Sequence, residues 1–184
     1  MPRTPRLEIA GYCYHVLNRA NARYRMFRKD ADFQAFERVL EEAVVRADGS
    51  VSLLAYCVMG SHWHLVIRTH AGGAMGQMMK WLTTTHAGRY RVAHGQVGLG
   101  RLYQGRYKSF LIEDDAHFLT VCRYVERNAA RASLVEHAED WRWSSLRFET
   151  GTLPVLGTDG EHADQRGRIG GVTLGVQAGS ALRQ

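Results

Sequence analysis

The sequence predicts an α+β fold in which an antiparallel sheet carries helices on one face. Strand-like and helix-like segments follow one another in the order β-α-β-β-α-β-α. The first six segments match the split βαβ, or ferredoxin-like, arrangement, and a further helix follows them. The length of 184 residues suits a single domain, and the 45% of hydrophobic residues can bury a substantial core.

The first strand and the first helix are indicated by two different periods. Residues 11–19 alternate and are rich in β-forming side chains, which predicts a strand. Residues 30–47 have the spacing of an amphipathic helix, and Asp30 is its expected N-cap. The apolar positions of this helix are Phe33, Phe36, Val39, Leu40 and Val44.

A hairpin and a second helix come next along the chain. Residues 50–59 and 62–69 are predicted strands, joined by a tight turn at Gly60-Ser61. Residues 74–93 are expected to form a helix.

The segments that follow are less regular. A glycine-spaced loop over 94–105 precedes a predicted strand over 106–113. Residues 114–135 begin with a capping aspartate and predict a helix. The aromatic segment 141–148 fits neither period clearly.

The composition changes at Gly151, after which 34 residues hold eight glycines and no aromatic side chain. We therefore expect one domain over 1–150 and a flexible tail over 151–184. The start of the chain lacks the apolar segment of a secretory signal, and no apolar stretch reaches membrane-spanning length. The three cysteines are widely spaced and fit neither a disulfide framework nor a zinc site, so a cytoplasmic location is expected.

The charge is basic and is carried by arginine. The formal net charge is +6, and only three of the 24 basic residues are lysines. Because guanidinium groups pair with phosphates and stack on bases, this balance favours a nucleic-acid partner. A GC-rich genome would also favour arginine over lysine, without any such partner.

Two histidines stand two residues apart in the second strand of the hairpin. Alternation places His62 and His64 on the same face, roughly 6.5 Å apart at Cα, while Trp63, Leu65 and Ile67 point to the core. Two imidazoles at this spacing can share one metal ion if a third ligand comes from elsewhere. They can equally be ordinary polar groups on a half-exposed face.

A tyrosine and an asparagine stand four residues apart on the last predicted helix. Tyr124 and Asn128 would lie on one face, beside an apolar stripe of Phe118, Cys122 and Val125. The amide oxygen of Asn128 could bind a hard cation. By itself this pattern is more typical of an ordinary amphipathic helix.

In combination, these segments resemble a known family. The order of "AYCVMGSHWHLVI" and "RYVERNAARASLV" resembles the HUH single-strand DNA endonucleases, in particular the REP-associated tyrosine transposases of the single-tyrosine branch. Further blocks resemble the family over residues 6–148, including "GYCYHVLNRANARYRMF", "RLYQGRYKSFLIE" and "WRWSS". The chain has Gly60-Ser61 where the family commonly has Pro-Asn, and Asn128-Ala129 where it commonly has Asn-Pro.

The resemblance implies a transposase-like activity on single-stranded DNA with hairpin-forming palindromic repeats. It implies a catalytic helix with Tyr124 as nucleophile, which would form a 5′-phosphotyrosine intermediate. His62, His64 and Asn128 would hold a divalent ion, Mg²⁺ or Mn²⁺. His15, on the first strand, is a candidate partner of this site, although a buried structural histidine is the more common situation.

Basic and aromatic residues near the fourth strand suit a groove for a single DNA strand. The candidate DNA-binding residues there are Arg101, Tyr103, Arg106, Tyr107 and Lys108, and the basic segment that follows the first strand adds Arg19 and Arg23. A solvated loop leading into an edge strand explains the same pattern without DNA. Relatives in this family act as monomers or as homodimers, and no membrane partner is expected.

Three other functions are compatible with the sequence. One is a ferredoxin-like nucleic-acid-binding module without chemistry. Another is a small metal hydrolase that uses His62, His64 and His70. The third is a replication initiator or relaxase of the same superfamily.

Overall fold

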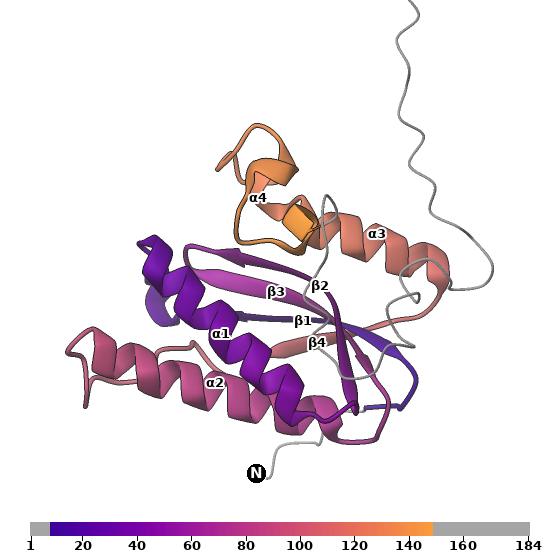
Figure 1. The fold of residues 1–184 in the computed structure, drawn as a ribbon, viewed down its shortest axis with the longest axis horizontal. Coiled ribbons are helices and arrows are strands. Elements are labelled where there is room, and N and C mark those ends of the chain that lie inside the picture. Colours follow the sequence, from indigo (N-terminus) through magenta and orange to yellow (C-terminus); the bar gives the residue numbers. More distant parts are fainter. Residues whose placement is uncertain (1–7, 149–184) are drawn as a thin grey trace, which may run out of the picture.

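The strands form one four-stranded antiparallel sheet in the computed structural model, which describes residues 8–148 apart from the side chains of Arg23 and Phe148. The strand order is β2-β3-β1-β4 (Figure 1). The strands are β1 (Cys13–Arg19), β2 (Val51–Met59), β3 (His62–Thr69) and β4 (Lys108–Ile112). This is the predicted ferredoxin-like topology, and the predicted strand limits agree within two residues.

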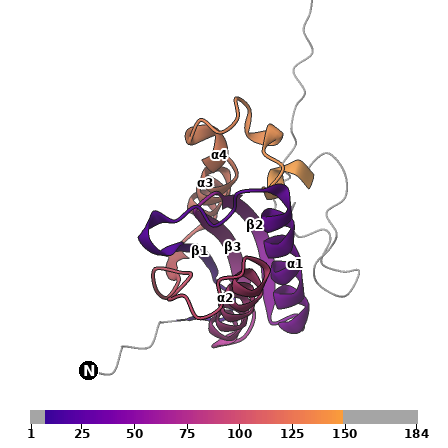
Figure 2. The same cartoon turned by 90° about the vertical axis from the view of Figure 1, so that its left-hand side faces the viewer.

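Two helices cover one face of the sheet, and a third helix lies on the other. Helices α1 (Asp30–Arg46) and α2 (Ala74–Ala93) lie together on one side (Figures 1 and 2). Helix α3 (Asp115–Glu126) lies on the opposite side. The prediction of two helices on one face plus a separate C-terminal helix is therefore confirmed.

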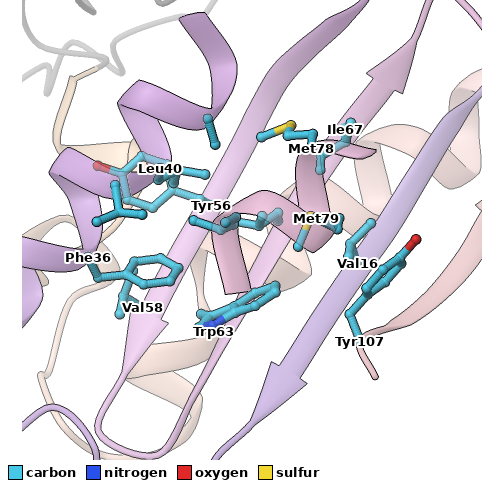
Figure 3. Close-up of a cluster of buried hydrophobic side chains, with 14 of the residues drawn as sticks. Val16, Phe36, Leu40, Tyr56, Val58, Trp63, Ile67, Met78, Met79 and Tyr107 are labelled. Atoms are coloured by element: carbon cyan, nitrogen blue, oxygen red, sulfur yellow. The ribbon is translucent and has the colours of Figure 1, made fainter. Parts of the chain in front are cut away.

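The main hydrophobic core lies between the sheet and the helices α1 and α2 (Figure 3). All five apolar positions predicted for α1 are buried there. The core also holds Trp63, Leu65 and Ile67, each with no exposed surface. The alternation predicted for β3 is thus confirmed, and it leaves the histidine face of the strand on the side of α3.

Helix α1 begins differently from the prediction. Asp30 lies inside the first turn and pairs with Arg142, with 2.9 Å between Oδ2 and Nη1. The carboxylate of Asp32 instead accepts hydrogen bonds from the backbone N–H groups of Arg28 and Lys29, at 2.9 and 3.2 Å. A carboxylate placed three residues after the cap reaches back to these unpaired donors, so the expected cap at Asp30 was wrong.

The predicted helix over 114–135 is two helices, α3 and the short α4 (Asn128–Arg131). The side chain of Asn128 donates a hydrogen bond to the carbonyl of Tyr124 at 3.3 Å, a local bond that competes with helical pairing. Ser133 then adopts a positive φ of 54°, and the N–H of Leu134 reaches the carbonyl of Ala129 at 3.0 Å. That bond across a left-handed residue is the usual way to end a helix.

The aromatic segment 141–148, for which the sequence predicted neither helix nor strand, forms hydrogen bonds with the outer edge of β2. The N–H of Val58 donates to the carbonyl of Trp143 at 2.8 Å, and the indole N–H of Trp141 donates to the carbonyl of Val58 at 2.9 Å. Short 3₁₀ turns complete this region, η2 (Ala138–Asp140) and η3 (Ser145–Phe148); a third, η1 (Asn21–Arg23), follows β1. Within residues 8–148, no strand pairs with the outer edge of β4.

None of the described helices is long and apolar enough to cross a membrane. The predicted tail over 151–184 lies outside the described residues.

Candidate active site

Three histidines meet on the face of the sheet that carries α3. In the register of β1 against β3, Leu17 lies opposite His64, and Arg19 lies opposite His62. The ring of His15 stacks on that of His64, with centroids 5.2 Å apart. The rings of His62 and His64 meet edge to face at the same centroid distance.

Hydrogen bonds fix the orientation of two of these rings. Nδ1 of His64 lies 2.9 Å from Nε2 of His15, and Nδ1 of His62 lies 3.1 Å from the hydroxyl of Ser61. In both His62 and His64, Nε2 is therefore the nitrogen left for a metal ion. A second hydrogen bond on the far ring nitrogen is the usual support for a histidine that binds a metal.

Burial keeps the three imidazoles neutral. It is the main cause that lowers the pKa of His64 to about 3, and the neighbouring His15 and His62 lower it further. Burial also lowers the pKa of His15 and of His62. A neutral imidazole has a free lone pair at neutral pH, which is the form that binds a metal.

Helix α3 brings Tyr124 to these histidines from a distant part of the chain. The ring of Tyr124 meets the rings of His15 and His64 edge-on, with centroids 5.9 and 6.0 Å apart. Tyr124 is 40% exposed, so its phenol remains accessible to a large substrate. Helix α3 is held in place by Val125, which packs with Val66 and Ala55 in a second apolar cluster under the helix.

Asn128 follows one turn after Tyr124, as predicted. Because its amide nitrogen bonds to the carbonyl of Tyr124, the amide oxygen is left as a possible metal ligand. Two neutral imidazole nitrogens and one amide oxygen are donors that suit a divalent ion. In residues 8–148 there is no group of three or more histidine, cysteine or acidic side chains placed to share an ion.

The three-histidine hydrolase site is contradicted by the structure. His70 follows the far end of β3, six residue steps after His64, which places the two Cα atoms about 20 Å apart. Its Nε2 lies 2.8 Å from the hydroxyl of Ser52. His70 therefore cannot bind the same ion as His62 and His64.

Most of the predicted basic DNA-binding residues are exposed. Arg19, Arg101, Arg106 and Lys108 are all exposed. Arg101 and Arg106 belong to the loop between α2 and β4, which crosses the end of β1 where the N–H of Gln104 donates to the carbonyl of Arg19 at 2.9 Å. The side chain of Arg23 is not described.

The two tyrosines predicted to stack on bases lie in the core instead. Tyr103 is 7% exposed and Tyr107 is 8% exposed. The hydroxyl of Tyr103 lies 2.7 Å from Nδ1 of the buried His86 and accepts a hydrogen bond from the indole of Trp63 at 3.2 Å. Burial raises the pKa of Tyr103. Both rings pack against protein, which leaves little surface for a nucleobase.

The sequence did not predict that Arg131 and Phe110 lie at this site. It indicated His15 only as a candidate partner of the site. Arg131 places its guanidinium 5.3 Å from the ring centre of Tyr124, and its spacing of seven residues from Tyr124 was the available signal. Phe110 is exposed beside His15, and the alternation of the fourth strand could have placed it. His15 itself is partly exposed and bonded to His64, so it is not an ordinary core histidine.

Comparisons with known proteins agree with this fold. The model of a family described as "Transposase IS200 like" matches residues 9–128. A solved structure of a REP-associated tyrosine transposase bound to a REP hairpin is similar, with a TM-score of 0.65, 16% identity, and coverage of 86% of this chain and 92% of that chain. A putative transposase from Deinococcus radiodurans is similar with a TM-score of 0.48, 17% identity, and coverage of 68% and 97% respectively. A search of the curated proteins found no match.

Proposed function

Because this chain belongs to the IS200-like transposase family, we propose that it is a metal-dependent single-strand DNA endonuclease and strand-transferase that uses Tyr124 as nucleophile. One observation carries the proposal. An accessible phenol from α3 lies against the paired imidazoles of His15 and His64, which come from two different strands. A candidate nucleophile beside His64, a potential metal ligand that His15 holds in place, suits phosphodiester transfer.

The first step forms a covalent protein–DNA bond. The Tyr124 oxygen attacks the phosphorus of the scissile phosphate and loses its proton as the new P–O bond forms. The bond from phosphorus to the 3′ oxygen breaks, and that oxygen leaves as a free 3′-OH after gaining a proton. The products are a 5′-phosphotyrosine and a DNA end with a 3′-OH.

The second step reverses the first with another strand. A 3′-OH attacks the phosphotyrosine, the new phosphodiester forms, and Tyr124 is released as a phenol. Because the number of phosphoester bonds is unchanged, the joining step requires no ATP.

His62, His64 and Asn128 would hold the divalent ion, Mg²⁺ or Mn²⁺. When bound, such an ion acts as a Lewis acid on the scissile phosphate and orients it. The imidazole of His15 holds His64 in the orientation that presents Nε2.

The basic residues around the site support a DNA substrate. Arg19, Arg101, Arg106 and Lys108 would neutralise backbone phosphates, together with Arg23. The similar solved structure holds a REP hairpin. We therefore propose single-stranded DNA with hairpin-forming palindromic repeats as the substrate class.

The test is the formation of a covalent adduct. End-labelled single-stranded oligonucleotides that carry the palindromes flanking the gene are incubated with the protein and Mn²⁺, then separated on denaturing gels. We expect an adduct with the wild type and with Tyr12→Phe, a matched change at another exposed tyrosine, but not with Tyr124→Phe or His64→Ala. An adduct that persists in Tyr124→Phe refutes the assigned nucleophile.

A nucleic-acid-binding module without chemistry is the second candidate. It would bind the same oligonucleotides equally well with or without metal and form no adduct. A replication initiator or relaxase would form the adduct but would nick at an origin-like sequence and would not join two palindrome-bearing ends.

A further inference from the structure

Phe110 is a large apolar side chain left in solvent beside the candidate active site. It lies in β4, at the open edge of the sheet, and is 54% exposed. The register pairs it with His15 across β1 and β4, so both side chains project from the face that carries α3. Helix α3 packs mainly over β2 and β3, which leaves this part of β4 uncovered.

The ring of Phe110 contacts the ring of His15, which in turn contacts the ring of Tyr124, the proposed nucleophile. Its centroid lies 6.2 Å from that of His15, and the His15 centroid lies 5.9 Å from that of Tyr124. An aromatic face at this position could contact a substrate group next to the atom that Tyr124 attacks.

Cationic side chains lie on the side of Phe110 toward the start of β4, while the acidic residues Glu113, Asp114 and Asp115 follow the other end of the strand. Lys108 lies two residues earlier on β4, projects from the same face opposite Leu17, and is exposed. Arg19 is exposed at the end of β1 on that face. Exposed aromatic rings beside cationic side chains are typical of surfaces that bind single-stranded nucleic acid, because bases stack on the rings while phosphates meet the charges.

We infer that Phe110 is the stacking platform for one unpaired nucleobase next to the scissile phosphate, and that Lys108 contacts the backbone of the same strand. The inference rests on the proposed function, since it places a base of the proposed substrate. Stacking is tolerant of sequence, so Phe110 positions the strand without selecting a particular base.

The experiment combines protein variants with DNA that lacks single bases. Binding of palindrome-bearing single-stranded oligonucleotides is measured in EDTA, with one abasic site moved stepwise across the nucleotides around the cleavage position. We expect the wild type to lose roughly tenfold in affinity at one abasic position. Phe110→Ala should lose a similar factor on intact DNA and show no further loss at that position.

Two further variants separate stacking from other effects. Phe110→Trp retains an aromatic face and should bind like the wild type, whereas Phe110→Leu retains only apolar area and should resemble Phe110→Ala. Val45→Ala removes an exposed apolar side chain from α1, away from β4, and should leave binding unchanged.

The outcomes distinguish this inference from the proposed function. The inference is overturned if Phe110→Ala loses affinity at the same abasic position as the wild type. If the wild type still forms the adduct in that case, the proposed function is unaffected. If Phe110→Ala instead turns a dimer into a monomer in sedimentation, the ring is covered by a second copy and the inference is likewise overturned. A wild type that neither binds nor cleaves these oligonucleotides overturns both.

Discussion

His15 supports His64 from a neighbouring strand, with 2.9 Å between Nε2 of the first ring and Nδ1 of the second. The contact joins residues 49 positions apart and fixes which nitrogen of His64 faces the site. We expect His15→Ala to weaken Mn²⁺ binding by roughly 10- to 100-fold, the usual effect of losing such a partner. Electron paramagnetic resonance of free Mn²⁺ measures this directly.

Two controls sharpen that test. His15→Gln retains a hydrogen-bonding group and should recover part of the affinity, while His117→Gln changes an exposed histidine on α3 and should have no effect. Equal Mn²⁺ affinity in His15→Ala and the wild type would show that the contact does not support the metal ligand.

The buried histidines predict a loss of stability in acid. Their pKa values in the folded state, about 3 for His64 and for His86, lie below the ordinary value of 6.5, so protons bind more tightly to the unfolded chain. Stability is therefore fully present above pH 6.5 and decreases as the pH falls toward 3. Each group contributes on the order of 1 kcal/mol per pH unit to the slope.

Urea unfolding of the metal-free protein at pH 7, 6 and 5 measures this slope. A free energy of unfolding that stays constant from pH 7 to 5 would contradict the neutral state assigned to these rings.

Asp114 anchors the start of α3, the helix that carries Tyr124. Its Oδ1 accepts a hydrogen bond from the N–H of His117 at 2.7 Å, as an N-cap does. Asp114→Ala should lower the free energy of unfolding by about 1 kcal/mol, whereas Asp114→Asn should retain most of it. Asp115→Asn serves as the matched control because that residue lies inside the helix; an equal loss in the control would exclude a capping role.

Arg131 places a cation next to the ring of Tyr124. Its guanidinium carbon lies 5.3 Å from the centre of the Tyr124 ring. If Tyr124 attacks a phosphate as proposed, this cation can stabilise the negative charge that develops. We expect Arg131→Ala to slow adduct formation roughly tenfold and Arg131→Lys to slow it less. The exposed neighbour Arg127→Ala is the comparison, and single-turnover kinetics is the measurement; identical rates for both alanine variants would remove Arg131 from the site.

Phosphate contacts predict a specific salt dependence. Each contact to single-stranded DNA contributes about −0.7 to the slope of log affinity against log salt. Arg19→Ala should therefore make the slope shallower by about this amount, while Arg38→Ala, exposed on α1 away from the site, should not change it. Titrations from 50 to 200 mM salt would contradict the assignment if Arg19→Ala keeps the wild-type slope.

Local periodicity correctly predicted the features that are set within a single strand or helix. The alternation that buries Trp63 and Leu65 also turns His62 and His64 to the other face, so the shared face of this histidine pair could be predicted from nine residues. Helical spacing likewise linked Tyr124 to Asn128.

The sequence did not predict features that depend on contacts between residues far apart along the chain. The burial of Tyr103 depends on His86 and Trp63, and its glycine-spaced loop carries no period that indicates this. The support of His64 by His15 requires the register of β1 against β3. The end of α4 depends on a left-handed serine at 133, a conformation that glycine usually signals.

Helix α3 is attached to the sheet much more lightly than the strands that carry the histidines. Val125 is its only buried residue, whereas β3 is buried along most of its length. Native-state hydrogen exchange should therefore find the amides of α3 opening at a lower free energy than those of β3. Such a local opening would separate Tyr124 from His15 and His64 while the core stays folded, so the candidate site would come apart at a lower free energy than the protein that carries it.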